Sequence, residues 1–232
     1  MKNRRTTRSP DRDILIVGGE DHKTGQADNA EDRHARLANW ARSRFPQMET
    51  VEFTWVGQVM ESIDGLAFIG RNPLDKENVF IATGDSGMGM THGTIAGILL
   101  TDLILGRENP WATLYDPSRK TLLAAGEFAK EAVNMAAQYA DWVTGGDVSS
   151  TDEIADDSGA VMRRGLSKIA VHRDAHGKLH ELSAVCPHLG CIVRWNASEK
   201  TWDCPCHGSR FGKLGKVING PANTDLAPTD EE

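Results

Sequence analysis

The sequence predicts an α+β fold in which a sheet-and-helix unit precedes a small antiparallel β domain. Strand-like and helix-like segments alternate over the first half of the chain. A long helical pattern follows, and short strand-like runs separated by Asp/Gly turns begin at Gly159. A length of 232 residues is enough for two modest domains.

Short apolar or alternating runs predict four strands in the first half. They cover residues 13–18, 51–56, 66–69 and 79–82. Apolar residues spaced among charges predict an amphipathic helix over 31–45, with Pro46 as its stop. A glycine-rich stretch, 84–93, leads into a second predicted helix over 94–105 that ends at Gly106.

The second half begins with a long helical pattern over residues 118–143. One stripe of this pattern carries apolar side chains at spacings of three and four: Phe128, Ala132, Met135, Tyr139 and Trp142. Such a stripe indicates a helix docked on a domain surface or at an interface. The segment 144–158 is rich in Gly, Asp and Ser, the composition of an interdomain linker. Strand-like runs then cover residues 166–172, 179–185 and 191–195.

The charge pattern separates a basic start from an acidic body. The chain has 26 Lys and Arg against 33 Asp and Glu, a net charge of −7, and its first twelve residues hold five basic residues and one acidic one. We expect residues 1–12 to be a disordered basic tail. Because the body has no broad basic face, we expect no nucleic acid partner. The remaining parts are predicted at 13–117, 118–158 and 159–232.

The sequence also bears on membranes and export. It contains no apolar run of about 20 residues, the length that spans a bilayer. The pair Arg4-Arg5 is not followed by the apolar region of a twin-arginine export signal, because Asp11 and Asp13 interrupt it. We therefore expect a cytoplasmic protein without a membrane partner.

All four cysteines lie between positions 186 and 206, which favours a metal site over a disulfide scaffold in a cytoplasmic chain. Cys186 and His188 form a C-x-H unit, and Cys204 and His207 form a C-x-x-H unit. Two such loops facing each other can hold a two-iron cluster, with two Cys on one iron and two His on the other. The alternative is a Cys2His2 zinc site, which mixed Cys/His units fit poorly.

The two boxes CPHLGC and CPCHGSRF closely resemble those of the Rieske family. The resemblance covers about 75 residues. It implies a 2Fe-2S cluster that passes single electrons, with four ligands: Cys186, His188, Cys204 and His207. Gly220-Pro221-Ala222 falls where the family has a proline loop beside the cluster.

The same resemblance assigns roles to the other residues of the boxes. It implies that Cys191 and Cys206 form a disulfide between the two loops. It further implies that the Ser209 hydroxyl reaches a bridging sulfide. At the place of Phe211, high-potential members carry a Tyr that donates to a ligand sulfur. Because Phe211 has no such donor, we expect a potential below the highest Rieske values.

The first half resembles the C-terminal portion of the FAD-dependent amino-acid oxidase superfamily. The resemblance rests on Asp64–Pro73 and on Asn78–Thr91, and it covers most of residues 13–117. In that family, a glycine-rich turn and a helix start approach the pyrimidine edge of the flavin. The implied flavin contacts are Gly87, Met88, Gly89, Met90 and Thr91. The alternative is a glycine-rich helix start that binds nothing.

The family binds the FAD diphosphate through a strand, a G-x-G-x-x-G turn and a helix. This sequence has no such element, because the spacing after Gly18-Gly19 fails and Glu20-Asp21 would repel phosphate. The chain therefore resembles the C-terminal half of a longer enzyme or a split-gene product. FAD is expected only if the missing half is supplied, and the partner is expected to be a flavin domain or a redox protein. The competing function is a stand-alone Rieske electron carrier.

Overall fold

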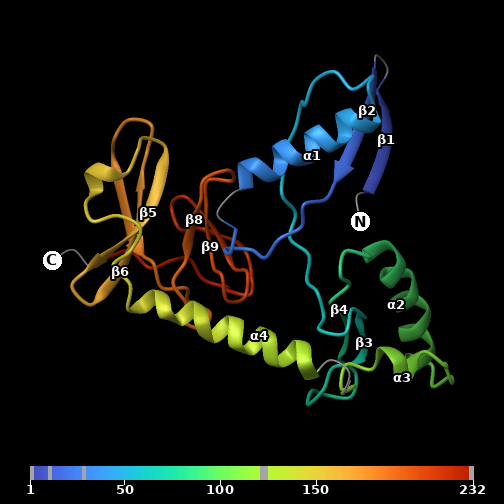
Figure 1. Cartoon of the computed structure of the whole chain (residues 1–232). Helices are drawn as coiled ribbons and strands as arrows, with labels where there is room; N and C mark the ends of the chain where they lie inside the picture. Colours follow the sequence, from blue (N-terminus) through green and yellow to red (C-terminus); the bar gives the residue numbers. More distant parts are fainter. Residues whose placement is uncertain (1–2, 10–11, 28–29, 121–124, 230–232) are drawn as a thin grey trace. The chain divides into compact units, whose positions relative to one another are not determined.

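The computed structural model describes residues 3–9, 12–27, 30–120 and 125–229 (Figure 1). The chain divides into two compact units. The larger unit combines Met1–Val56 with Met135–Glu232, and the smaller unit is Gly57–Asn134. None of the helices in the described ranges is long and apolar enough to cross a membrane.

The larger unit opens with an antiparallel hairpin of β1 (Asn3–Ser9) and β2 (Arg12–Gly18). The expected disordered tail is therefore wrong for residues 3–9 and for Arg12, while residues 1–2 and 10–11 lie outside the described residues. The backbone groups of β2 need partners whatever the charge of the neighbouring segment, and β1 supplies them. Helix α1 (Ala30–Arg44) follows close to its predicted bounds.

The segment 51–56 does not form the predicted strand. Phe53 and Trp55 are 71% and 63% exposed, so the alternating apolar side chains face solvent. Alternation predicts a strand only if a neighbouring edge accepts its hydrogen bonds, and the described residues offer none here.

In the smaller unit, β3 (Phe68–Arg71) and β4 (Phe80–Thr83) pair antiparallel and pack with α2 (Gly89–Ile104) and α3 (Ala112–Tyr115). The core of this unit contains Ala67, Ile69, Ala96, Leu99 and Tyr115. Helix α2 begins five residues before its predicted start, because the glycine-rich stretch itself enters the helix.

Arg119 closes the smaller unit. Its guanidinium donates to both carboxylate oxygens of Asp64, at 2.7 and 2.8 Å, and to the carbonyls of Leu66 and Ala67. It also lies 4.0 Å from the centre of the Phe68 ring. This pair is mostly buried and fully hydrogen-bonded, so it fixes the turn before β3.

The predicted helix over 118–143 is α4 (Ala125–Gln138), continued by the 3-10 turn η2 (Tyr139–Trp142). Positions 121–124 lie outside the described residues. The division between the two units falls within α4, after Asn134. Phe128 is 62% exposed, whereas the side chains of Tyr139 and Trp142 hydrogen-bond to the β domain. The docking prediction is therefore confirmed for the end of the stripe.

The segment 144–158 is packed onto the β domain and is not a free linker. The Asp147 carboxylate accepts from the backbone N–H of Val161 at 2.8 Å, and Arg173 donates to the Ile154 carbonyl at 2.8 Å. The polar residues that gave it a linker composition are used as hydrogen-bond partners and as the cap of η3 (Thr151–Glu153).

The β domain has two antiparallel sheets. The first has β5 (Ser158–Arg164), β6 (Ser167–Arg173) and β7 (Leu179–Ser183) in sequence order. The second has the order β11-β10-β9-β8, with β8 (Arg194–Asn196), β9 (Thr201–Asp203), β10 (Arg210–Gly212) and β11 (Val217–Asn219). Strand β5 begins inside the predicted linker, and the run at 191–195 is a strand only from Arg194. The core residues include Val161, Ala170, Val193, Trp202 and Phe211.

The β6–β7 hairpin carries three histidines, His172, His176 and His180. His172 is fully buried, stacked between His180 and Trp195, and its Nδ1 bonds to the Ser158 carbonyl at 2.9 Å. Burial lowers the pKa of His172. The His172 side chain is thus a core residue, whereas His180 is half-buried and His176 is exposed.

Candidate metal centre

Two loops of the β domain carry the predicted ligands, and the backbone builds both in the same way. In the first loop, the Cys186 N–H donates to the Cys191 carbonyl at 2.8 Å, and the Gly190 N–H donates to the Cys186 carbonyl at 2.9 Å. In the second loop, Cys204 N–H donates to the Ser209 carbonyl at 2.8 Å and Gly208 N–H to the Cys204 carbonyl at 3.0 Å.

Each loop turns through a glycine in the left-handed region, where a side chain is strained. The φ angles are 77° at Gly190 and 78° at Gly208. The box sequences therefore fold locally into two equivalent tight turns, one after β7 and one between β9 and β10. These turns place a cysteine at the start of each loop.

The structure brings the four predicted ligands together as two pairs. Cys186 and Cys204 are free thiols, each about 1% exposed, and their side chains are hydrogen-bonded to each other. The rings of His188 and His207 meet edge to face, with centroids 4.8 Å apart. One pair offers two sulfurs and the other offers two imidazoles.

The contact between the two thiols favours an anionic sulfur at Cys186. The hydrogen bond from Cys204 lowers the pKa of Cys186 to about 6, assisted by the His188 N–H and the Ser209 hydroxyl. The same contact, followed by burial, raises the pKa of Cys204. Backbone N–H groups of Cys206 and His207 also point at the Cys204 sulfur. Donors to ligand sulfur are among the features that set the potential of an iron–sulfur cluster.

The histidine pair is arranged for binding through nitrogen. The Nδ1 atom of His188 is buried and has no hydrogen-bond partner among the described residues, an arrangement that costs free energy unless a ligand occupies it. Desolvation by burial lowers the pKa of His207, which favours the neutral imidazole that binds metal. The residues present therefore fit a Rieske 2Fe-2S cluster.

Cys191 and Cys206 form a disulfide, so this implication of the sequence is confirmed. Their Cα atoms are 6.4 Å apart, and the bridge joins the two ligand loops across a sequence separation of 15. The sulfurs of Cys191, Cys204 and Cys206 lie within 4.8 Å of one another. Because two of these sulfurs are bonded together, Cys204 is the one that offers a thiolate.

The expected tuning residues lie against the thiol pair. Ser209 is fully buried, its hydroxyl bonds to Cys186, and its Oγ accepts from the Ala222 N–H at 3.0 Å. The proline loop therefore sits beside the site, as the resemblance implied. Phe211 is fully buried in the same apolar cluster as both ligand cysteines, and its ring brings no hydrogen-bond donor.

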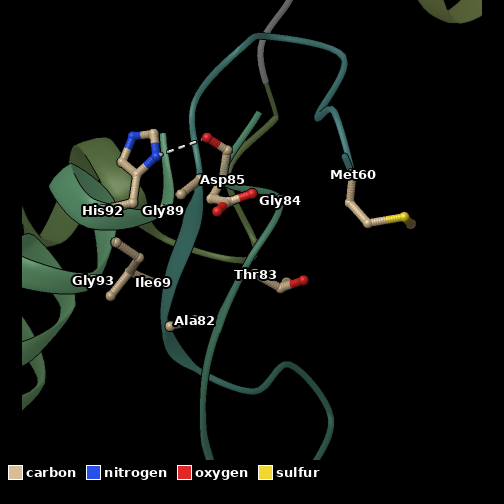
Figure 2. A pocket seen from close by; sticks show the side chains of 10 residues that line it. Met60, Ile69, Ala82, Thr83, Gly84, Asp85, Gly89, His92 and Gly93 are labelled. Atoms are coloured by element: carbon tan, nitrogen blue, oxygen red, sulfur yellow. Dashed lines mark hydrogen bonds between the residues drawn. The ribbon is translucent and has the colours of Figure 1, made fainter. Parts of the chain in front are cut away.

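The smaller unit holds a cavity of about 320 Å³ at the start of α2 (Figure 2). Its wall is formed by Met60, Ala67, Ile69, Ala82, Thr83, Gly84, Asp85, Gly89, His92 and Gly93. Of the five predicted flavin contacts, Gly89 alone lines this cavity. The side chains of Met88 and Met90 are 59% and 83% exposed.

Sequence reasoning missed Asp85 and His92 in this cavity. A Cβ on Gly89 would lie 2.7 Å from Asp85 Oδ2, so the carboxylate stands at the start of α2. Figure 2 shows the His92 ring beside Asp85, where Nδ1 bonds to the Asp85 carbonyl at 3.0 Å. The sequence does contain a signal for His92. It follows Gly89 by three residues, so the two residues share one face of the helix.

In the cavity wall, Gly84 has a φ angle of 69°, a conformation that lets the backbone come close to a flat ring. The volume lies at the lower end of the range for small-molecule sites, enough for a ring system but small for a dinucleotide.

Models of known protein families match both halves of the chain. The model for FAD dependent oxidoreductases matches residues 3–103, and the model for the Rieske [2Fe-2S] domain matches residues 145–229. The chain belongs to the Rieske [2Fe-2S] family, with an FAD oxidoreductase-type portion in front of the Rieske domain.

Several known proteins are similar to this chain. YhfW of Bacillus subtilis (strain 168), named a Rieske 2Fe-2S iron-sulfur protein, is 34% identical over 221 residues. That match covers 94% of this chain and 43% of the relative. The cytochrome b6-f complex iron-sulfur subunit 2 of Synechocystis sp. (strain ATCC 27184 / PCC 6803 / Kazusa) is 35% identical to this chain. That match covers 60% of this chain and 71% of the relative. The solved plasma membrane Rieske protein of Synechocystis PCC 6803 matches with 31% identity and a TM-score of 0.28, over 30% of this chain and 72% of that one.

Proposed function

We propose that this chain carries single electrons away from the reduced flavin of an FAD-dependent oxidoreductase. The observation that carries the proposal is the presence, on one chain, of a built Cys/His cluster site and a flavoenzyme-type unit. The chain spans 43% of the length of YhfW. The substrate and the remainder of the flavin site belong to the proposal as expectations only.

At the metal centre, a bound 2Fe-2S cluster supplies a one-electron redox centre. The thiolates of Cys186 and Cys204 would hold one iron of the cluster, and the imidazoles of His188 and His207 would hold the other. The N–H groups and the Ser209 hydroxyl that point at the sulfurs stabilise negative charge there. The disulfide fixes the spacing of the two loops, and the surrounding apolar core keeps water from the sulfurs.

At the cavity of the smaller unit, FAD would supply a centre that accepts two electrons from a substrate and releases them singly. The backbone at Gly84 and Gly89, which lines the cavity, would face its ring, and the start of α2 would offer free N–H groups. In the larger unit, the exposed apolar side chains of Phe53 and Trp55 support pairing of the segment 51–56 with a further strand. The diphosphate would be bound elsewhere, because the sequence has no G-x-G-x-x-G turn.

The second candidate is a stand-alone Rieske carrier that binds no flavin. The position of Asp85 favours it, because a carboxylate at the start of α2 already meets the positive end of the helix dipole. An anionic ring would then have to share that end with the carboxylate. In either function, the electron partner is another redox protein or a flavin domain.

Composition and spectroscopy of the anaerobically purified chain test the proposal. We expect two irons and two acid-labile sulfides per chain, and the low-average-g EPR signal of mixed nitrogen and sulfur ligation after reduction. A Cys204→Ser variant should lose the cluster, whereas His176→Ala, at an exposed histidine outside the site, should retain it. Stoichiometric zinc without labile sulfide in a folded sample would refute the electron-transfer role.

Flavin binding separates the two candidates. Titration with FAD, followed by fluorescence, should show weak binding by the chain alone, because most of the affinity in this fold comes from the diphosphate. Reduced FAD added to the oxidised protein should then bleach the cluster under anaerobic conditions. If FAD neither binds nor reduces the cluster at any concentration tested, the stand-alone carrier is the correct function.

A further inference from the structure

The first cluster loop is hydrogen-bonded from outside by the 3-10 turn η2. Tyr139 Oη donates to the Leu189 carbonyl at 2.7 Å, and Trp142 Nε1 donates to the Gly190 carbonyl at 2.9 Å. These two carbonyls are consecutive, and they lie between the ligand His188 and the disulfide cysteine Cys191. The residues that supply the donors precede the matched Rieske domain, residues 145–229.

The turn η2 has its own anchors on the β domain. Asp141, between the two donors, accepts from Arg194 Nε and NH2 at 3.0 and 2.8 Å. Trp142 also packs against the apolar cluster that contains the ligand cysteines. Because Asp141 and Trp142 anchor η2 on the β domain, the hydrogen bonds that η2 donates can restrain the loop rather than follow its movements.

The second cluster loop is held in the same manner by a segment near the start of the chain. Gln26 Nε2 donates to the carbonyl of Pro205, which lies between Cys204 and Cys206, at 2.8 Å. The preceding Gly25 is in such close contact that a Cβ there would lie 2.7 Å from the Pro205 nitrogen. Arg194 also donates to the Gly25 carbonyl at 3.4 Å, so one arginine contacts both holding segments.

We propose that Tyr139, Trp142 and Gln26 form an outer brace that positions the cluster. Internal hydrogen bonds and the disulfide already hold the two loops. The brace binds loop carbonyls that those internal bonds do not use. It keeps His188 and Cys204 in place in both oxidation states and opposes the opening of either loop. Gln26 belongs to the part that matches FAD oxidoreductases, so this part contacts the cluster housing directly. The inference rests on the proposed function in one respect: the four ligands must bind the 2Fe-2S cluster.

The test uses variants that remove donors and keep shape. Tyr139→Phe combined with Trp142→Phe removes the bonds to the first loop, and Gln26→Leu removes the bond to the second. Trp111→Phe, at a tryptophan of the smaller unit, is the matched control. The first readout is the rate at which an iron chelator bleaches the cluster, and the second is the EPR spectrum with the reduction potential. A third is the rate at which a thiol reductant cleaves the disulfide in cluster-free protein.

We expect each lost hydrogen bond to speed cluster loss about fivefold, which corresponds to about 1 kcal/mol at 1.4 kcal/mol per tenfold change. The g-values and potential should shift in the brace variants, disulfide cleavage should accelerate, and the control should match the unchanged protein. Equal rates and identical spectra in the Tyr139/Trp142 double variant would overturn the brace. The disulfide-cleavage readout does not require a bound cluster, so it tests the brace by itself. The iron and sulfide content of the unchanged protein tests the proposed function separately.

Discussion

Replacing Ser209 by Ala should lower the reduction potential of the cluster. The hydroxyl bonds to Cys186 and accepts from the Ala222 N–H, and the side chain is fully buried, so water cannot replace it. Reduction adds negative charge at the sulfurs, and a donor there stabilises the reduced form. A hydrogen bond to a charged group is worth about 1.5 kcal/mol. Since about 59 mV corresponds to about 1.4 kcal/mol for one electron, the potential should fall by up to roughly 60 mV.

The loss of the Ala222 partner adds a second, independent effect. A buried N–H left unpaired costs about 1 to 3 kcal/mol, so the variant should also unfold more easily. Protein-film voltammetry at one pH measures the potential, and chemical denaturation measures the stability. Ser198→Ala is the control, because its hydroxyl bonds to Asn196 in a turn of the second sheet. An unchanged potential with an intact EPR signal would show that the hydroxyl does not act on the cluster.

Three further variants test other parts of the structure. Phe211→Tyr should raise the potential by up to roughly 60 mV by voltammetry, because the new hydroxyl donates to a ligand sulfur; an unchanged potential would mean that the ring does not point there. Cys191→Ala should lower the stability of the β domain by about 3 kcal/mol in chemical denaturation, since the lost bridge to Cys206 closes a separation of 15 residues; free thiols at both positions in the unchanged protein would contradict this. Arg119→Ala should destabilise the smaller unit by about 3 to 5 kcal/mol, seen as faster amide exchange around Asp64, because a mostly buried carboxylate loses its partner; unaltered exchange would show that the pair is not structural.

The metal centre could be predicted from the sequence because its information is local. The spacing within each box fixes which side chains share a turn, and the structure pairs Cys186 with Cys204 and His188 with His207 as the resemblance implied. The flavin contacts were less readable. A helix start exposes both donors and side chains, and sequence alone does not report that Asp85 lies at the start of α2.

Features that depend on distant partners could not be read at all. The bonds of Tyr139 and Trp142 to the first loop span 50 and 48 residues, and that of Gln26 to the second spans 179. The apolar alternation at Phe53 and Trp55 is a real strand signal, but a strand also needs a neighbouring edge. Residues 3–9 show the converse. This basic segment forms a strand because β2 provides a neighbouring edge.

The matching turns of the two ligand loops separate scaffold from chemistry. In both loops, the backbone pattern depends on the first residue, on a glycine at the fifth position, and on the carbonyl of the sixth. The first loop places its histidine third and a disulfide cysteine sixth, whereas the second places its histidine fourth and Ser209 sixth. The side chains at the third, fourth and sixth positions therefore differ between the loops, while the peptide geometry is the same in both. Redesign of the ligand set can proceed by moving residues among these positions while Gly190 and Gly208 stay unchanged.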